Sequence, residues 1–137
     1  FIGSPQMNFV DAQCVVEGAK ASLKFDKYQV ELPAEKAKKL IDGGYAGKTV
    51  VFGIRPEDLY DSDEHLEKFA ASTIEADITG YELLGAEVLL YYSLAGANMT
   101  ARVDSDTEAR FGDHIKLALD PSKIHVFDKE TELTITN

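Results

Sequence analysis

The stretch VDAQCVVEGAKASLKFDKYQVEL, residues 10–32, decides the fold because apolar and polar residues alternate along most of its length. Successive side chains of a strand point to opposite faces, so a period of two is typical of strands with one buried face. Gly18 and the pair Asp26-Lys27 interrupt the alternation where tight turns are expected. The stretch therefore predicts three consecutive strands joined by two hairpins.

The period of two continues through the rest of the chain. We expect further strands at residues 49–54, 74–78, 87–94, 98–103, 113–119, 124–127 and 133–135, with a kinked corner between Gly80 and Gly85. Short strands at this spacing predict an all-β fold, either an OB-like Greek-key barrel or packed antiparallel strands, with one or two short helices.

Two segments are candidates for those helices. Pro33 suits a first helical turn, and the residues from Ala34 to Ile41 are mostly good helix formers that end at Gly43-Gly44. Residues 62–71 fit either a short helix or an acidic loop, and we favour the loop.

The alternation also predicts which side chains lie inside. One parity of each strand is apolar, and that parity is expected to form the core. The expected core residues are Val10, Val16, Leu23, Phe25, Val30, Phe52, Ile54, Ile78, Leu90, Val103, Leu117, Leu119 and Phe127.

The chain has 137 residues, of which 45% are hydrophobic and 28% are charged, which is typical of one ordinary globular domain spanning residues 1–137. No uncharged apolar run approaches the roughly 18 residues that a transmembrane helix needs, so we expect a soluble fragment. Cys14 is the lone cysteine, which excludes an intrachain disulfide and fits a reducing compartment.

One stretch comes close to a phosphate-binding P-loop. Residues 42–49 read DGGYAGKT, but Asp42 stands where the motif needs its leading glycine. A helix precedes the stretch and a strand follows it, whereas a P-loop leads from a strand into a helix whose amides face the phosphate. We therefore expect no phosphate site there.

A second stretch resembles the start of a calcium loop. Asp104, Asp106 and Glu108 alternate as oxygen ligands do, but Ala109 replaces the glycine required at position six and Ile115 the glutamate at position twelve. We interpret the segment as an acidic connector.

The histidines and serines show no catalytic or metal-binding spacing. His65, His114 and His125 are isolated in sequence and are expected to face solvent, and no serine lies in a Gly-x-Ser-x-Gly turn. We predict no catalytic residue, no metal site and no cofactor in these residues.

Three stretches carry a family resemblance: FIGSPQMNF at 1–9, GIRPEDL at 53–59 and FGDHIKLALDPSKIHVFD at 111–128. They resemble the C-terminal regulatory domain, with TOBE and OB-like folds, of the ATP-binding subunit of carbohydrate ABC importers of the maltose-transporter type. The resemblance covers the whole chain. Its motif and interface candidates are Gly3, Ser4, Pro5, Asn8, Gly53, Arg55, Pro56 and Glu57.

The resemblance implies a parent ABC transporter ATPase. Residues 1–9 would be the linker from an absent nucleotide-binding domain, which would hold ATP and Mg, and the present residues would have a regulatory role without ATPase activity. The implied partners are a second copy in a weak homodimer, the chain's own nucleotide-binding domain and, in some members, a phosphotransferase-system IIA protein or a transcription regulator. The implied location is cytoplasmic, at the inner face of the membrane through the permease subunits.

Two residues of the stretch GIRPEDL have roles that their chemistry suggests. Arg55 offers a planar fork able to hold a carboxylate or backbone carbonyls, and we favour a structural clamp at the strand end over a contact with the partner subunit. Glu57 lies near helix-start amides that favour an anion. Glu132 departs from the family, whose members often carry glycine at this turn, which puts the shape of the last hairpin in doubt.

Two other functions stay open. A small-oxyanion binder would need Ser, Thr, Lys and backbone amides that converge on one point. A module for single-stranded nucleic acid is the weaker alternative, because it would need a basic groove, whereas this chain has 24 acidic and 14 basic residues and a formal net charge of −10.

Overall fold

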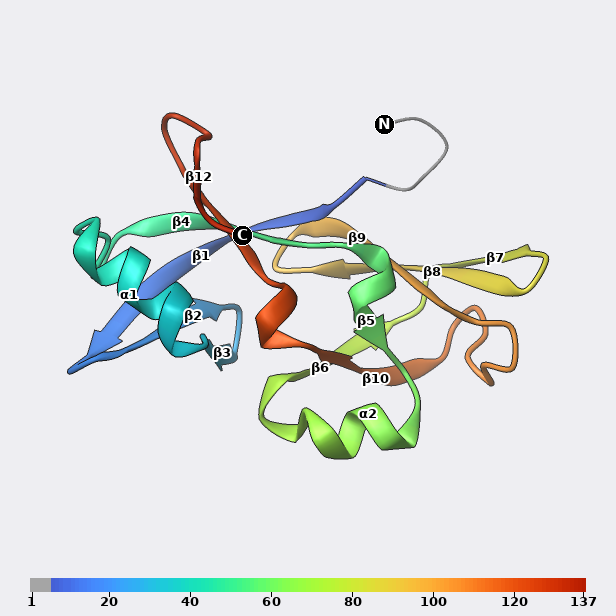
Figure 1. Ribbon diagram of the computed structural model, residues 1–137. Helices are drawn as coiled ribbons and strands as arrows, with labels where there is room; N and C mark the ends of the chain where they lie inside the picture. The colour runs from blue at the N-terminus through green and yellow to red at the C-terminus, as the bar shows by residue number, and fades with distance from the viewer. Residues whose placement is uncertain (1–5) are drawn as a thin grey trace. The chain divides into compact units, whose positions relative to one another are not determined.

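Figure 1 shows the computed structural model, which describes residues 6–137 as two compact units. We call residues 6–8 and 55–120 the first unit, and Phe9–Ile54 with Pro121–Asn137 the second unit. The expectation of one domain over residues 1–137 stays a prediction, as does the linker role of residues 1–9, although the first strand already begins at Asn8.

The second unit is built on a six-stranded sheet with the order β12-β11-β4-β1-β2-β3. The strands are β1 (Asn8–Glu17), β2 (Lys20–Phe25), β3 (Tyr28–Glu31), β4 (Thr49–Ile54), β11 (His125–Asp128) and β12 (Thr134–Thr136). Cys14 pairs with Leu23 and Leu23 pairs with Val30, so three buried side chains lie in one row across β1, β2 and β3. The predicted three-stranded stretch is confirmed.

The turns in that stretch lie where the alternation breaks. Gly18 has a φ of 63° and Asp26 a φ of 52°, both in the left-handed region that tight hairpin turns require. Glycine and aspartate are among the residues that adopt this region most readily, which explains why the sequence marks both turns.

The predicted helix after Pro33 is also confirmed as α1 (Ala34–Asp42). The amide of Ala37 donates to the carbonyl of Pro33 at 2.9 Å, and the helix ends at Gly43. Ala37 and Leu40 of α1 are buried, and α1 packs on β2 and β12. The buried Lys36 ammonium donates to the carbonyl of Asn137, next to β12.

The last hairpin forms without a glycine. Glu132 adopts a φ of 63°, and the turn is held by the Asp128 carboxylate, which accepts from the amides of Glu130 at 2.9 Å and Thr131 at 2.8 Å. The Tyr45 hydroxyl also donates to Asp128, at 2.7 Å. These hydrogen bonds, the Thr131 amide first, lower the pKa of Asp128 to about 2, so the turn keeps its acceptor over the whole physiological pH range.

The first unit contains two three-stranded antiparallel sheets, with the orders β5-β10-β6 and β7-β8-β9. The strands are β5 (Leu59–Tyr60), β6 (Thr73–Asp77), β10 (His114–Leu119), β7 (Gly80–Leu84), β8 (Glu87–Leu94) and β9 (Ala97–Asp104). Short 3-10 turns lie at η1 (Pro56–Asp58) and η2 (Ala70–Ser72), and η3 (Pro121–Lys123) belongs to the second unit.

Two local predictions in the first unit are wrong. The segment favoured as a loop contains α2 (Asp63–Lys68), which lies along β10 (Figure 1), because the Ser62 hydroxyl caps it by accepting from the amide of His65. The expected corner is strand β7, and only Gly85 is a left-handed turn residue there, with a φ of 61°. At Gly80 an added Cβ would lie 2.9 Å from the Tyr91 ring, so this glycine permits close packing.

The predicted core is confirmed except at two residues. All of its members are buried apart from Val16 and Phe127, which are half-buried. Val16 lies next to the Gly18 turn, and Phe127 packs edge-on against Phe9, which is itself 47% exposed. The architecture is mostly antiparallel β with two short helices, and neither described helix is long and apolar enough to cross a membrane.

Candidate functional site

A groove of about 710 Å³ lies between three segments of the first unit. Residues 61–66 form one wall, 106–109 a second and 113–116 the third. The charged lining residues are Asp61, Asp63, Asp106, Glu108, Asp113, His114 and Lys116. Carboxylates outnumber basic groups, so an anion entering this groove would meet repulsion, whereas a cation would be attracted.

The connector between β9 and β10 shapes this groove. Thr107 is buried, and its hydroxyl donates to the Asp61 carboxylate and accepts from the amide of Ala109 at 3.1 Å. Arg110 donates to the carbonyls of Thr107 and Ala109 at 2.9 and 2.8 Å, and its guanidinium lies 5.0 Å from the centre of the Tyr81 ring. The connector is therefore fastened by its own hydrogen bonds and by a cation–π contact.

The acidic residues of this connector do not converge. Asp104, Asp106 and Glu108 are all exposed, and they flank the buried Thr107 and Ala109 rather than a common centre. Within residues 6–137 no group of three or more His, Cys, Asp or Glu side chains is placed to hold a metal ion.

A smaller cleft of about 220 Å³ lies beside the Arg-Pro-Glu turn. Glu57 lines it together with Tyr60, His65 and Arg102. His65 stacks on Tyr60 with ring centres 4.0 Å apart and planes 7° apart. Burial, and then the carboxylates of Asp58, Asp120 and Glu57, raise the pKa of Tyr60. The Tyr60 hydroxyl therefore stays protonated at neutral pH, with carboxylates nearby.

The resemblance residues divide into buried and exposed positions. Gly53 is buried in β4 opposite His125, and Pro56 is buried at the start of η1. Arg55 and Glu57 are exposed. The Arg55 carbonyl accepts from the amide of Asp58 at 3.0 Å, whereas within the described chain the Arg55 guanidinium makes no hydrogen bond or ion pair. Gly3, Ser4 and Pro5 lie outside the described residues.

Asn8 has a structural role that its residue type explains. It is 4% exposed, its side-chain amide donates to the carbonyl of Thr100 at 2.8 Å, and its side-chain oxygen accepts from the amide of Thr100 at 2.7 Å. The carboxamide therefore satisfies both backbone groups of one residue in β9, as a neighbouring strand would.

The stretch that resembles a P-loop belongs to the second unit and is bonded to β1. The amide of Gly47 donates to the carbonyl of Cys14 at 2.8 Å, and the amide of Lys48 donates to the carbonyl of Tyr45 at 2.9 Å. The stretch follows α1 and precedes β4, as the sequence predicted. Amides used in this way do not form the phosphate cradle of a P-loop.

The histidines have more defined surroundings than the sequence suggested. His114 is exposed as expected, but His65 and His125 are half-buried, because His65 stacks on Tyr60 and His125 lies within β11. Sequence reasoning missed the contacts of His114 with Glu75 and Asp77. The sequence does show that Glu75 and Asp77 share one face of β6. It does not show that His114 lies opposite them, because that depends on the register of β6 with β10.

We expect Arg55→Ala to leave the melting temperature of the chain almost unchanged and to act instead on the contact between two copies that the family resemblance implies. The exposed guanidinium stabilises no described neighbour, so its removal resembles a surface substitution. Thermal unfolding and sedimentation equilibrium of Arg55→Ala separate the two effects. A large fall in melting temperature would support the structural clamp. No change in melting temperature or in association would mean that Arg55 has no special role.

Two family models match the chain: the MalK OB fold domain over residues 3–59 and the TOBE domain over residues 52–127. The chain is 39% identical over 135 residues to the oligosaccharides import ATP-binding protein MsmX of Bacillus subtilis, covering 98% of this chain and 36% of that protein. It is 34% identical over 132 residues to the trehalose/maltose import ATP-binding protein MalK of Thermococcus litoralis, covering 96% and 35%. The chain thus spans about a third of the length of these relatives.

A solved structure shares the fold at low identity. The cytoplasmic molybdate-binding protein ModG, in a crystal form with molybdate bound, superposes with a TM-score of 0.62 and 16% sequence identity. The match covers 91% of this chain and 96% of that one. At this identity the likeness supports the predicted OB-like and TOBE-type fold and nothing about the ligand.

Proposed function

Since this chain belongs to the TOBE domain family and also contains a MalK-type OB fold domain, we propose that it is the regulatory and dimerisation region of the ATP-binding subunit of an oligosaccharide ABC importer. The observation that carries the proposal is the match of nearly the whole chain to the C-terminal part of sugar-import ATP-binding proteins.

The exposed side chains support a role in association. In the first unit Leu83 is 59% exposed and Phe111 is 74% exposed, and Arg55 and Glu57 are exposed on the turn that starts η1. Large apolar and planar cationic groups at the surface are typical of interfaces. We propose a second copy of the chain and its own nucleotide-binding domain as partners, with a phosphotransferase-system IIA protein or a transcription regulator as the source of a signal.

The same proposal places the chain in the cell. The importer's permease subunits would hold it at the cytoplasmic face of the membrane, so the chain itself needs no lipid contact. ATP and Mg would be bound by the nucleotide-binding domain of the parent protein, and the residues present here would need no cofactor.

We expect residues 1–137 not to bind Mg-ATP. Asp42 stands where a P-loop has glycine, and the amides of Gly47 and Lys48 already donate to backbone carbonyls. Titration calorimetry with Mg-ATP is expected to show no binding at micromolar concentrations. Micromolar affinity that Lys48→Ala abolishes would overturn this part of the proposal.

A hybrid protein tests the proposed function in a cell. Residues 1–137 would replace the C-terminal region of the Bacillus subtilis relative, in a strain that lacks that relative. The hybrid is expected to restore growth on an imported oligosaccharide better than the relative truncated before this region. A hybrid with Leu117→Asp, which places a charge in the core, is the control for a misfolded region. Growth equal to the truncated protein, at equal protein levels, would refute the proposal.

A further inference from the structure

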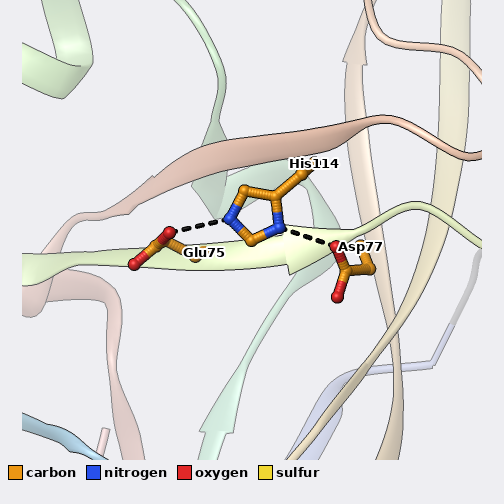
Figure 2. Close-up of polar contacts among 3 residues, drawn as sticks. All are labelled: Glu75, Asp77 and His114. Atoms are coloured by element: carbon orange, nitrogen blue, oxygen red, sulfur yellow. Dashed lines mark hydrogen bonds and ion pairs between the residues drawn. The ribbon is translucent and has the colours of Figure 1, made fainter.

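His114 lies between two carboxylates on the neighbouring strand, as Figure 2 shows. Its Nδ1 is 2.6 Å from Oδ1 of Asp77, and its Nε2 is 2.7 Å from Oε1 of Glu75. His114 pairs with Asp77 in the register of β10 with β6, and Glu75 is two residues earlier on the same face. The imidazole therefore bridges one strand to two positions of the other.

Counting protons defines the state of this bridge. An ionised carboxylate only accepts hydrogen bonds, and a neutral imidazole has one N–H and one bare nitrogen. Contacts of 2.6 and 2.7 Å at both ring nitrogens therefore require both nitrogens to donate. That condition is met by the imidazolium, whereas a neutral ring would turn a lone pair towards one carboxylate.

We propose that His114 is a proton-controlled bridge between β6 and β10, closed when the imidazole is charged and open when it loses its proton, on the wall of the acidic groove. The proposal is independent of the transporter function. It adds a pH-sensitive element to a groove whose other charged residues are mostly acidic.

The charges around His114 favour the closed state. Hydrogen bonds to Glu75 and then to Asp77 raise the pKa of His114 above its ordinary value, against a smaller opposing effect of desolvation. Lys116 on the same strand is the basic residue that lines the groove with His114. The other titratable groups that line the groove are Asp61, Asp63 on α2, and Asp106, Glu108 and Asp113 on the connector. The elements packed against β10 add Tyr60 on β5 and Glu64, His65, Glu67 and Lys68 on α2.

The sign of the pH effect follows from this direction. A group whose pKa is higher in the folded than in the unfolded chain stabilises the fold fully below the unfolded value of about 6.5, and this contribution disappears as the pH rises through the folded value. Two backbone hydrogen bonds of 2.8 Å lie next to the bridge, where the pairing of β6 with β10 ends. The amide of Ile78 donates to the carbonyl of Asp113, and the amide of Gly112 donates to the carbonyl of Ile78. These amides should therefore be less protected once the bridge opens.

Nitrogen NMR of the imidazoles in the chain of residues 1–137, from pH 5 to 9, tests the bridge. We expect His114 to titrate above 6.5, with both ring N–H protons protected at low pH, and its midpoint to fall in both Glu75→Gln and Asp77→Asn. The exposed Glu64→Gln is the matched control, since Glu64 on α2 does not line the groove, and it should leave the midpoint unchanged.

Amide exchange gives a second measurement. Corrected for intrinsic rates, the protection of Ile78 and Gly112 is expected to fall across the His114 titration in the wild-type chain and to stay flat in His114→Gln. A wild-type midpoint at or below 6.5, or one that neither carboxylate variant lowers, would overturn the proposal. Protection that does not change across the wild-type titration would also overturn it, even if His114→Gln fails to fold.

Discussion

Leu117→Ala is expected to lower the free energy of unfolding by about 2–5 kcal/mol. Leu117 is fully buried on β10, the central strand of its sheet, where it pairs with the buried Ile74 of β6. Truncation leaves a cavity in a closely packed core, whose side chains have little freedom to close it. Denaturant titration followed by circular dichroism measures the loss.

The neighbouring residue provides the matched control. Lys116 lies on the opposite parity of the same strand and is exposed, so Lys116→Ala is expected to change stability by less than about 0.5 kcal/mol. Equal losses for Leu117→Ala and Lys116→Ala would mean that the inward face of β10 is assigned wrongly.

Asn8→Ala is expected to cost roughly 1–3 kcal/mol, the second largest effect. The substitution removes both partners of the Thr100 backbone, whose amide and carbonyl are bonded to the Asn8 carboxamide at 2.7 and 2.8 Å. A partly buried backbone group without a partner costs its full desolvation free energy. This cost is larger than the net contribution of an ordinary hydrogen bond to stability.

Asn98→Ala is the control for Asn8→Ala, because Asn98 is an exposed asparagine on β9, two residues before Thr100. It should be nearly neutral in the same denaturant titration. A loss for Asn8→Ala no greater than that for Asn98→Ala would show that the Thr100 backbone finds its partners in water instead.

Much of the fold was predictable because burial follows the alternation of the sequence. Residues 10–32 specify three strands through side-chain parity and two turn signals, and α1 follows from Pro33 and the glycines after Asp42. The helix α2 escaped prediction because its residues are mostly charged, and because its cap at Ser62 and the stacking of His65 on Tyr60 are visible only in the structure.

The candidate site was less predictable because it depends on register and on distant contacts. Asn8 stood out through a family resemblance, but its pairing with Thr100 joins residues 92 positions apart. The bridge from His114 to Glu75 and Asp77 needs the antiparallel register of β6 with β10. The buried Thr107 that holds Asp61 lies within a segment whose acidic residues first suggested a calcium loop.

Sedimentation equilibrium of residues 1–137 at low and moderate salt tests most directly whether this chain is a dimerisation region. We predict a reversible dimer with a dissociation constant of about micromolar or weaker, because in the full importer the other subunits would hold both copies close. Each copy carries a formal charge of −10, so association should tighten as salt screens the repulsion within about 10 Å at 0.1 M. A strict monomer at high concentration, or a nanomolar dimer insensitive to salt, would contradict the account.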